Sequence, residues 1–144
     1  MELKLALGID NIKFGLIQDE VFSLLGNPNK IHIDEDDENE IVCDWNDYKF
    51  RLTFYKDENL KLGYIRIKNQ NLTFKNQKII GQSLRQVKEI VFAHLNNWEL
   101  DEYEFFSTYF NEKFWLTLHV DYGIIEEVEI GVPFKNNFEY DWPE

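Results

Sequence analysis

The chain of 144 residues contains little sulfur and little proline, with one Cys, one Met and three Pro. The single cysteine, Cys43, excludes an internal disulfide framework and fits a reducing compartment. No apolar run reaches the ~20 residues that a membrane-spanning helix needs, and residues 1–26 lack the charged and apolar regions of a secretory signal peptide. We therefore expect a cytoplasmic protein that has no membrane partner.

Motifs that carry chemistry are also missing. The sequence has no glycine-rich phosphate loop, no Gly-x-Ser-x-Gly elbow and no cysteine beside an evident base. Its histidines, His32, His94 and His119, have no second histidine or cysteine at zinc-ligand spacing. The acidic run 34–40 lacks the glycine and the closing glutamate of a calcium loop. The sequence predicts a protein that is not an enzyme and has no cofactor or metal site, and no motif favours a hydrolase with paired carboxylates.

Charge and aromatic residues are abundant. The formal net charge is −12, and the chain holds 12 Phe, 7 Tyr and 4 Trp. Residues 34–48 contain eight acidic and no basic side chains, residues 49–88 contain two acidic and ten basic ones, and residues 97–144 contain twelve acidic and two basic ones. Such a field repels nucleic acid and favours encounter with a basic protein.

Two stretches of the chain resemble each other. Residues 49–57 read Lys-Phe-Arg-Leu-Thr-Phe-Tyr-Lys-Asp and residues 113–121 read Lys-Phe-Trp-Leu-Thr-Leu-His-Val-Asp, both with the alternation of a strand. A shift of 64 residues matches them, and a shift of 66 matches Gly15 with Gly81 and Val21 with Val87. We interpret the pattern as the duplication of one unit.

The surrounding segments predict the elements of that unit. Apolar spacing predicts a helix over 18–25, which Gly26 and Pro28 end, and a longer helix over 82–97 with Ser83 as its N-cap. The acidic run 34–40 predicts an exposed hairpin loop. Alternation and turn residues predict strands over 31–33, 41–45, 49–56, 62–68, 104–110, 113–120 and 125–130.

Together these elements predict an α+β fold. We expect two tandem α-βββ repeats that form one mostly antiparallel sheet with the helices packed on one face. Residues 1–144 then make a single domain, with repeats over about 10–70 and 76–132 and an aromatic, acidic C-terminal tail.

The uncovered face of this sheet is the predicted binding surface. On it the first repeat presents Arg51, Tyr55, Tyr64, Arg66 and Lys68, and the second presents Trp115, His119, Glu127 and Glu129. Trp, Tyr and Arg dominate the binding energy of protein interfaces. The alternative interpretation is that Trp115 and Tyr55 cap the edges of the core.

Residues 12–28 also resemble a known type of repeat. The pattern is Phe-Gly, then a helix with Glu-Val, then Leu-Leu-Gly-x-Pro, and it is similar to the helix-plus-sheet repeats of beta-lactamase inhibitor protein and of SmpA/OmlA-type lipoproteins. Small bacterial immunity proteins resemble these in build. The second copy keeps Gly81 and Val87 but lacks Gly-x-Pro, and one cysteine cannot form the two disulfides expected of the secreted inhibitor.

The resemblance implies an inhibitor that acts by direct docking. Our leading hypothesis is an immunity protein, a monomer or weak dimer when free, that neutralises a basic toxin, with a nuclease as the expected target. The alternative is a small-ligand or peptide-binding module that uses the exposed sheet face. The predicted partner-binding residues are Asp34, Glu35, Asp36, Asp37, Glu38, Asp44, Trp45, Asp47, Arg51, Tyr55, Trp115, His119, Glu127 and Glu129.

Overall fold

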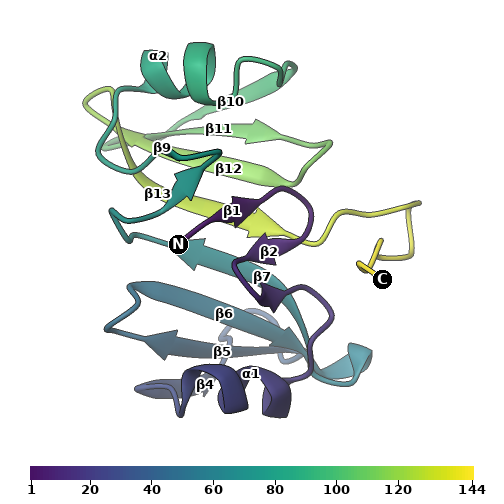
Figure 1. Cartoon of the computed structure of the whole chain (residues 1–144). Coiled ribbons are helices and arrows are strands. Elements are labelled where there is room, and N and C mark those ends of the chain that lie inside the picture. The colour runs from purple at the N-terminus through teal and green to yellow at the C-terminus, as the bar shows by residue number, and fades with distance from the viewer.

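The computed structural model describes all 144 residues and consists mostly of antiparallel β-structure with few helices (Figure 1). Its main sheet has eight strands in the order β10-β11-β12-β13-β7-β6-β5-β4. Every neighbouring pair in this sheet is antiparallel. The predicted α+β class and the mostly antiparallel sheet are therefore confirmed.

The main sheet joins two four-stranded meanders. The first contains β4 (Lys30–Ile33), β5 (Glu40–Trp45), β6 (Phe50–Tyr55) and β7 (Lys61–Ile67). The second contains β10 (Trp98–Glu102), β11 (Ser107–Asn111), β12 (Leu116–Asp121) and β13 (Ile124–Gly131). The last strands of the two meanders, β7 and β13, pair with each other, with Arg66 opposite Glu129. We call this central β7–β13 pair the seam.

One face of the sheet is covered. Helix α1 (Gln18–Leu25), the helical turns α2 (Leu84–Gln86) and η2 (Val87–Val91), and the small strands β1 (Leu3–Lys4), β2 (Gly8–Ile9) and β3 (Ile12–Lys13) lie on it (Figure 1). The hairpin of β8 (Thr73–Phe74) and β9 (Gln77–Lys78) lies on the same side, and the short helix η1 (Lys56–Glu58) follows β6. The core fills this layer with fully buried side chains such as Leu52, Phe54, Leu118 and Ile130.

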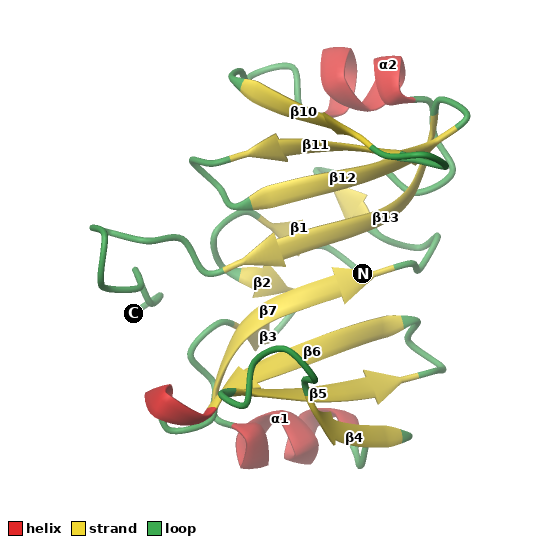
Figure 2. Ribbon diagram, turned by 180° about the vertical axis from the view of Figure 1, so that it is seen from behind, coloured by secondary structure: helices red, strands yellow, loops and turns green.

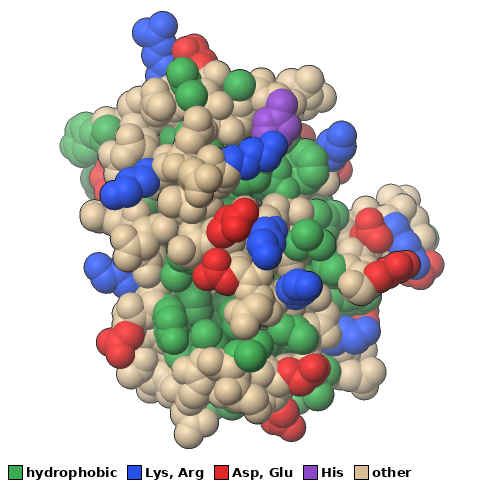
Figure 3. Space-filling view, in the orientation of Figure 1, with side chains coloured by type: hydrophobic (Ala, Val, Ile, Leu, Met, Phe, Trp, Pro, Cys, Tyr) green, Lys and Arg blue, Asp and Glu red, His purple; other side chains and the backbone are tan.

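The two faces of the sheet differ in what covers them. On the covered side, the helices and small strands form a surface on which acidic and basic side chains are interspersed (Figure 3). Seen from behind, no helix lies across the middle strands (Figure 2). We call this uncovered side the open face.

The two predicted helices had different outcomes. The helix over 18–25 is confirmed, and Gly26 ends it with a positive φ of 80°. The helix over 82–97 is wrong beyond Val91, although the Ser83 side chain caps it by accepting from the Gln86 N–H. The chain leaves helical geometry at Phe92, which is fully buried and packs between Phe74 and Trp98. Residues 98–102 then form β10, which was not predicted, and the strand expected from 104 begins only at Ser107.

The two similar stretches also align differently from the prediction. Lys49 ends the turn before β6 with a φ of 54°, and Trp115 ends the turn before β12 with a φ of 49°. These residues occupy equivalent places, because Lys49 O accepts from Lys68 N and Trp115 O accepts from Gly131 N. The turns before β6 and β12 thus end 66 residues apart, whereas the two similar sequences match at a shift of 64. The predicted strand from 113 starts at Leu116, because residues 112–115 form the turn.

Candidate functional site on the open face

Strand alternation places a polar surface on the open face. Asp44, Arg51, Arg66 and Glu129 follow one another across β5, β6, β7 and β13 in directly paired positions. Their sequence neighbours on each strand point to the covered face, where Cys43, Leu52, Ile65, Ile67, Val128 and Ile130 are buried. The open face is therefore the side on which polar and charged groups can meet a partner.

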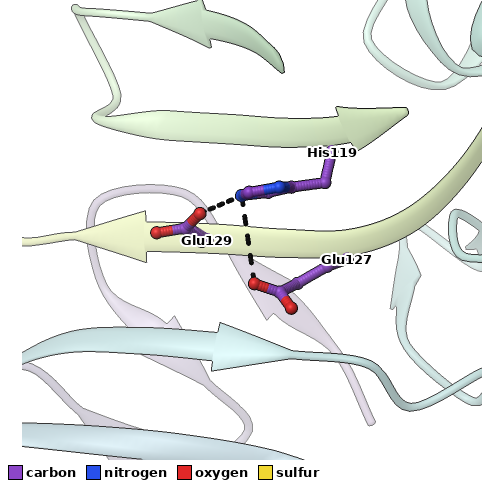
Figure 4. Close-up of side chains that lie close together, drawn as sticks. All are labelled: His119, Glu127 and Glu129. Carbon is purple, nitrogen blue, oxygen red and sulfur yellow. Dashed lines mark hydrogen bonds and ion pairs between the residues drawn. The ribbon is translucent and has the colours of Figure 1, made fainter. Parts of the chain in front are cut away.

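A cluster of charged residues lies on the open face along the seam. Figure 4 shows His119 pointing from β12 toward Glu127 and Glu129 on β13, where its Nε2 contacts Glu129 Oε2 and lies 3.9 Å from Glu127 Oε1. The residues of β7 complete the cluster. We call the six residues Tyr64, Arg66, Lys68, His119, Glu127 and Glu129 the seam cluster.

Side chains of β7 and of Lys68, the residue after it, bind the two carboxylates. Arg66 Nε donates to Glu127 Oε1 at 2.8 Å, and a terminal nitrogen of the same guanidinium lies 2.6 Å from that oxygen. Lys68 Nζ lies 3.5 Å from Glu127 Oε2, and Tyr64 Oη donates to Glu129 Oε1 at 2.7 Å. A basic strand of one meander thus binds an acidic strand of the other.

Burial and these contacts perturb two titrating groups. Burial acts to raise the pKa of Glu129, but the contacts with His119, Tyr64 and Arg66 outweigh it and hold the pKa below its usual value. Burial, followed by the negative charge of Glu129, raises the pKa of Tyr64. At neutral pH, Glu129 is therefore an anion and Tyr64 is a neutral donor.

The cluster also brings together three potential metal ligands. The ligand atoms of His119, Glu127 and Glu129 lie within 4.8 Å of one another. The prediction of no metal site considered only spacing along the chain, whereas strand pairing puts His119 directly opposite Glu127. A cation here would have to displace Arg66 and Lys68 from carboxylates that they already neutralise, so the charge balance favours a structural ion-pair network.

A hollow of about 410 Å³ lies beside the seam cluster, over β5, β6 and β7. Arg51 forms a two-point ion pair with Asp44 at its edge, with distances of 2.7 and 3.2 Å. We call it the basic hollow; its lining residues are Asp44, Trp45, Asn46, Lys49, Phe50, Arg51, Arg66, Lys68 and Glu127.

Two exposed loops flank the open face, and the first of them is acidic. The first, residues 34–39 between β4 and β5, exposes Glu35, Asp36, Asp37 and Glu38 as predicted. Asp34 shapes this loop because its Oδ2 accepts from the backbone N–H groups of Asp36 and Asp37. In Figure 2 the loop curves forward over the lower part of the sheet. The predicted Asp47 is exposed in the β5–β6 turn, at the other end of β5.

The second loop, residues 103–106 between β10 and β11, contains three aromatics and one acid, and the sequence analysis did not predict it. It exposes Tyr103, Phe105 and Phe106, and Phe105 is 79% exposed. Phe106 stacks on Tyr103 and on His119, and together these rings help to line a second hollow of about 400 Å³. The sequence does show three aromatics around Glu104, but we assigned these residues to a strand over 104–110 and so did not expect an exposed loop.

Three aromatic residues that were predicted to bind a partner pack against other residues of this chain instead. Trp45 is buried, packs edge-on against Phe22 of α1 and donates to Gly26 O. Tyr55 is buried and stacks on Tyr140 of the tail. Trp115 is half-buried between Phe110 and Phe134, which matches the alternative interpretation of an edge cap.

Comparison of the chain with protein-family models, with curated proteins and with solved structures found no match. None of the helices is both long and apolar enough to span a membrane. A proposal for the function therefore depends on the geometry of the open face and its loops.

Proposed function

We propose that this protein docks a basic protein on its open face and acts as an immunity protein that neutralises a bacterial toxin. The observation that supports this most directly is the loop of residues 103–106. Exposed apolar residues that are grouped together mark interaction sites, and here Tyr103, Phe105 and Phe106 are all exposed in one loop. The acidic residues Asp101, Glu102 and Glu104 are their neighbours in sequence and are exposed as well. Aromatic anchors within an acidic surface suit a partner that is basic and has an apolar pocket.

The first acidic loop supplies a second contact region. Its four exposed carboxylates, Glu35, Asp36, Asp37 and Glu38, have no cation within ion-pair distance, so their field is available to a partner. A field of this sign speeds the encounter with a basic surface. In this proposal the two loops contact the rims of the partner, and the open face lies between them.

We also infer that the two meanders are copies of one unit. Gly15 N donates to Leu62 O, and Gly81 N donates to Ile125 O. The reverse bonds run from Leu62 N to Leu16 O and from Ile125 N to Gln82 O. In both halves of the chain, the segment before a helix thus exchanges two backbone hydrogen bonds with the last strand of the following meander. This similarity supports the predicted tandem repeats.

The docking proposal is tested with the product of the neighbouring gene, which the proposal expects to be a basic toxin domain. We expect the purified pair to form a complex by isothermal titration calorimetry, and we expect Phe105→Ala to weaken the dissociation constant by about tenfold or more. Tyr122→Ala is the matched control, because Tyr122 is 98% exposed but lies in the β12–β13 turn, where the next residue, Gly123, contacts α2.

Two outcomes would contradict the proposal. One is binding no tighter than to an unrelated basic protein. The other is an equal loss of affinity in Phe105→Ala and Tyr122→Ala, because the 103–106 loop would then contribute no more to binding than an exposed aromatic elsewhere. As a further measure, replacing Glu35 and Glu38 by Gln is expected to slow association mainly at low salt.

A further inference from the structure

Two arginines face each other in the middle of the open face. Arg51 on β6 is directly opposite Arg66 on β7. Like charges in directly opposed positions destabilise a sheet. Asp44 and Glu127 each bind one of the two guanidinium groups, but the arginines remain neighbours. A local conflict of this kind is typical of a functional site.

The basic hollow also has an excess of positive charge. Its lining contains four cationic side chains, Lys49, Arg51, Arg66 and Lys68, but only two carboxylates, Asp44 and Glu127. The difference is two positive charges, in a chain whose net charge is −12. The surplus is therefore local and has the opposite sign to the rest of the molecule.

The arginines retain free donors toward the hollow. A guanidinium has five N–H groups in a planar fork. Arg51 uses Nε and one terminal nitrogen on Asp44, and Arg66 uses Nε and one terminal nitrogen on Glu127. Both side chains are 41% exposed, so the remaining N–H groups can reach a ligand.

We propose that the basic hollow binds the phosphoryl group of a small phosphorylated molecule. A phosphate monoester has a charge of about −1.5 to −2 at neutral pH and three acceptor oxygens, which matches the surplus charge and the planar donors. The hollow of about 410 Å³ is larger than a phosphoryl group alone. The remaining volume can take the organic part of such a molecule.

The acidity of the whole chain does not prevent this binding. At physiological salt the Debye length is about 8 Å, so charges farther away are largely screened. The acidic groups inside the hollow are already paired with arginine. Lys49 has no ion-pair partner, and Lys68 shares Glu127 with Arg66, so both lysines retain positive charge that attracts an anion. This inference goes beyond the proposed docking function and does not depend on it.

The test uses isothermal titration with inorganic phosphate, AMP and phenyl phosphate on the intact protein. We expect the two monoesters to bind, and adenosine and phenol not to bind, at concentrations up to about 10 mM. Replacing Lys49 and Lys68 by Gln leaves both arginine-carboxylate pairs in place and is expected to weaken binding by about fivefold or more. The matched control replaces Lys78 and Lys88 by Gln, because neither lysine lines the hollow.

The arrangement can also be observed directly. On titration, the Nε–H resonances of Arg51 and Arg66 should shift in nitrogen-detected NMR spectra, while that of Arg85, which pairs with Glu89 on the covered side, should not. Binding that is equally weakened by the two double substitutions would overturn the proposal, as would the absence of binding by every phosphate compound. A stronger response to malate than to the monoesters would overturn the assignment of the phosphoryl group.

Discussion

Tyr64 Oη donates a hydrogen bond of 2.7 Å to Glu129 Oε1, and so a side chain of one meander holds a carboxylate of the other. Tyr64→Phe removes this donor and leaves a mostly buried anion with one partner fewer. We expect a loss of about 1–2 kcal/mol in the free energy of unfolding, measured with urea near neutral pH. Tyr103→Phe is the control, because its hydroxyl has no hydrogen-bond partner in the chain. Equal losses in the two variants would contradict this role for the bond.

Stability should depend on pH through Glu129. Because the folded state holds the pKa of this carboxyl below the ordinary value of 4.5, its ionisation stabilises the fold above that pH. This contribution is lost as the pH falls through the folded-state pKa. We therefore expect Glu129→Gln to be less stable than the natural protein near neutral pH, and we expect this gap to narrow as the pH is lowered below 4.5. Urea unfolding across this pH range measures the difference, and a gap independent of pH would contradict the assignment.

Gly63 leaves room for the ring of Tyr55. A Cβ atom at this position would lie 2.0 Å from Cε2 of that ring, so Gly63→Ala forces the tyrosine to move. We expect a cost of about 1–3 kcal/mol in thermal or urea unfolding. In a Tyr55→Ala background the obstruction is gone, and the same glycine substitution should cost much less. An unchanged cost would assign the effect to the backbone instead.

Cys43 is fully buried, and burial raises the pKa of its thiol. The thiolate is the reactive form, so we expect the folded protein to resist labelling by a thiol reagent at mildly alkaline pH. Labelling should become fast in guanidinium chloride and should follow the unfolded fraction. Rapid labelling of the folded protein, by absorbance or mass spectrometry, would contradict the burial of this side chain.

Local signals in the sequence were sufficient for part of the fold. Helix α1 was predicted correctly because Gly26 and Pro28 mark its end within the chain itself. The second helix was predicted too long because Leu95 continues the apolar spacing of Leu84, Val87 and Val91, although the structure uses Leu95 in the core after the helix has ended. Periodicity indicates which residues are buried, but it does not determine the backbone conformation at those residues.

Predicting the site requires knowing which distant segments of the chain pair with each other. Arg51, His119, Glu127 and Glu129 were all selected individually, and alternation correctly placed Arg66 and Lys68 on the same face. Their grouping depends on the pairing of β7 with β13, which joins residues more than 60 positions apart and has no signature in either strand alone. The 103–106 loop was missed for a related reason, since β10 is needed to turn those residues into a hairpin end.

The seam also determines which strands can pair. Val128 and Ile130 would pack equally well beside any apolar strand, so the covered face gives little discrimination. On the open face, a second molecule that offered its own β7 would bring Arg66 and Lys68 against identical cations, and one that offered β13 would oppose Glu127 and Glu129 to themselves. Only the union of β7 with β13 matches opposite charges. The charges of the seam cluster therefore disfavour the pairing of β7 with β7, or of β13 with β13, between two molecules.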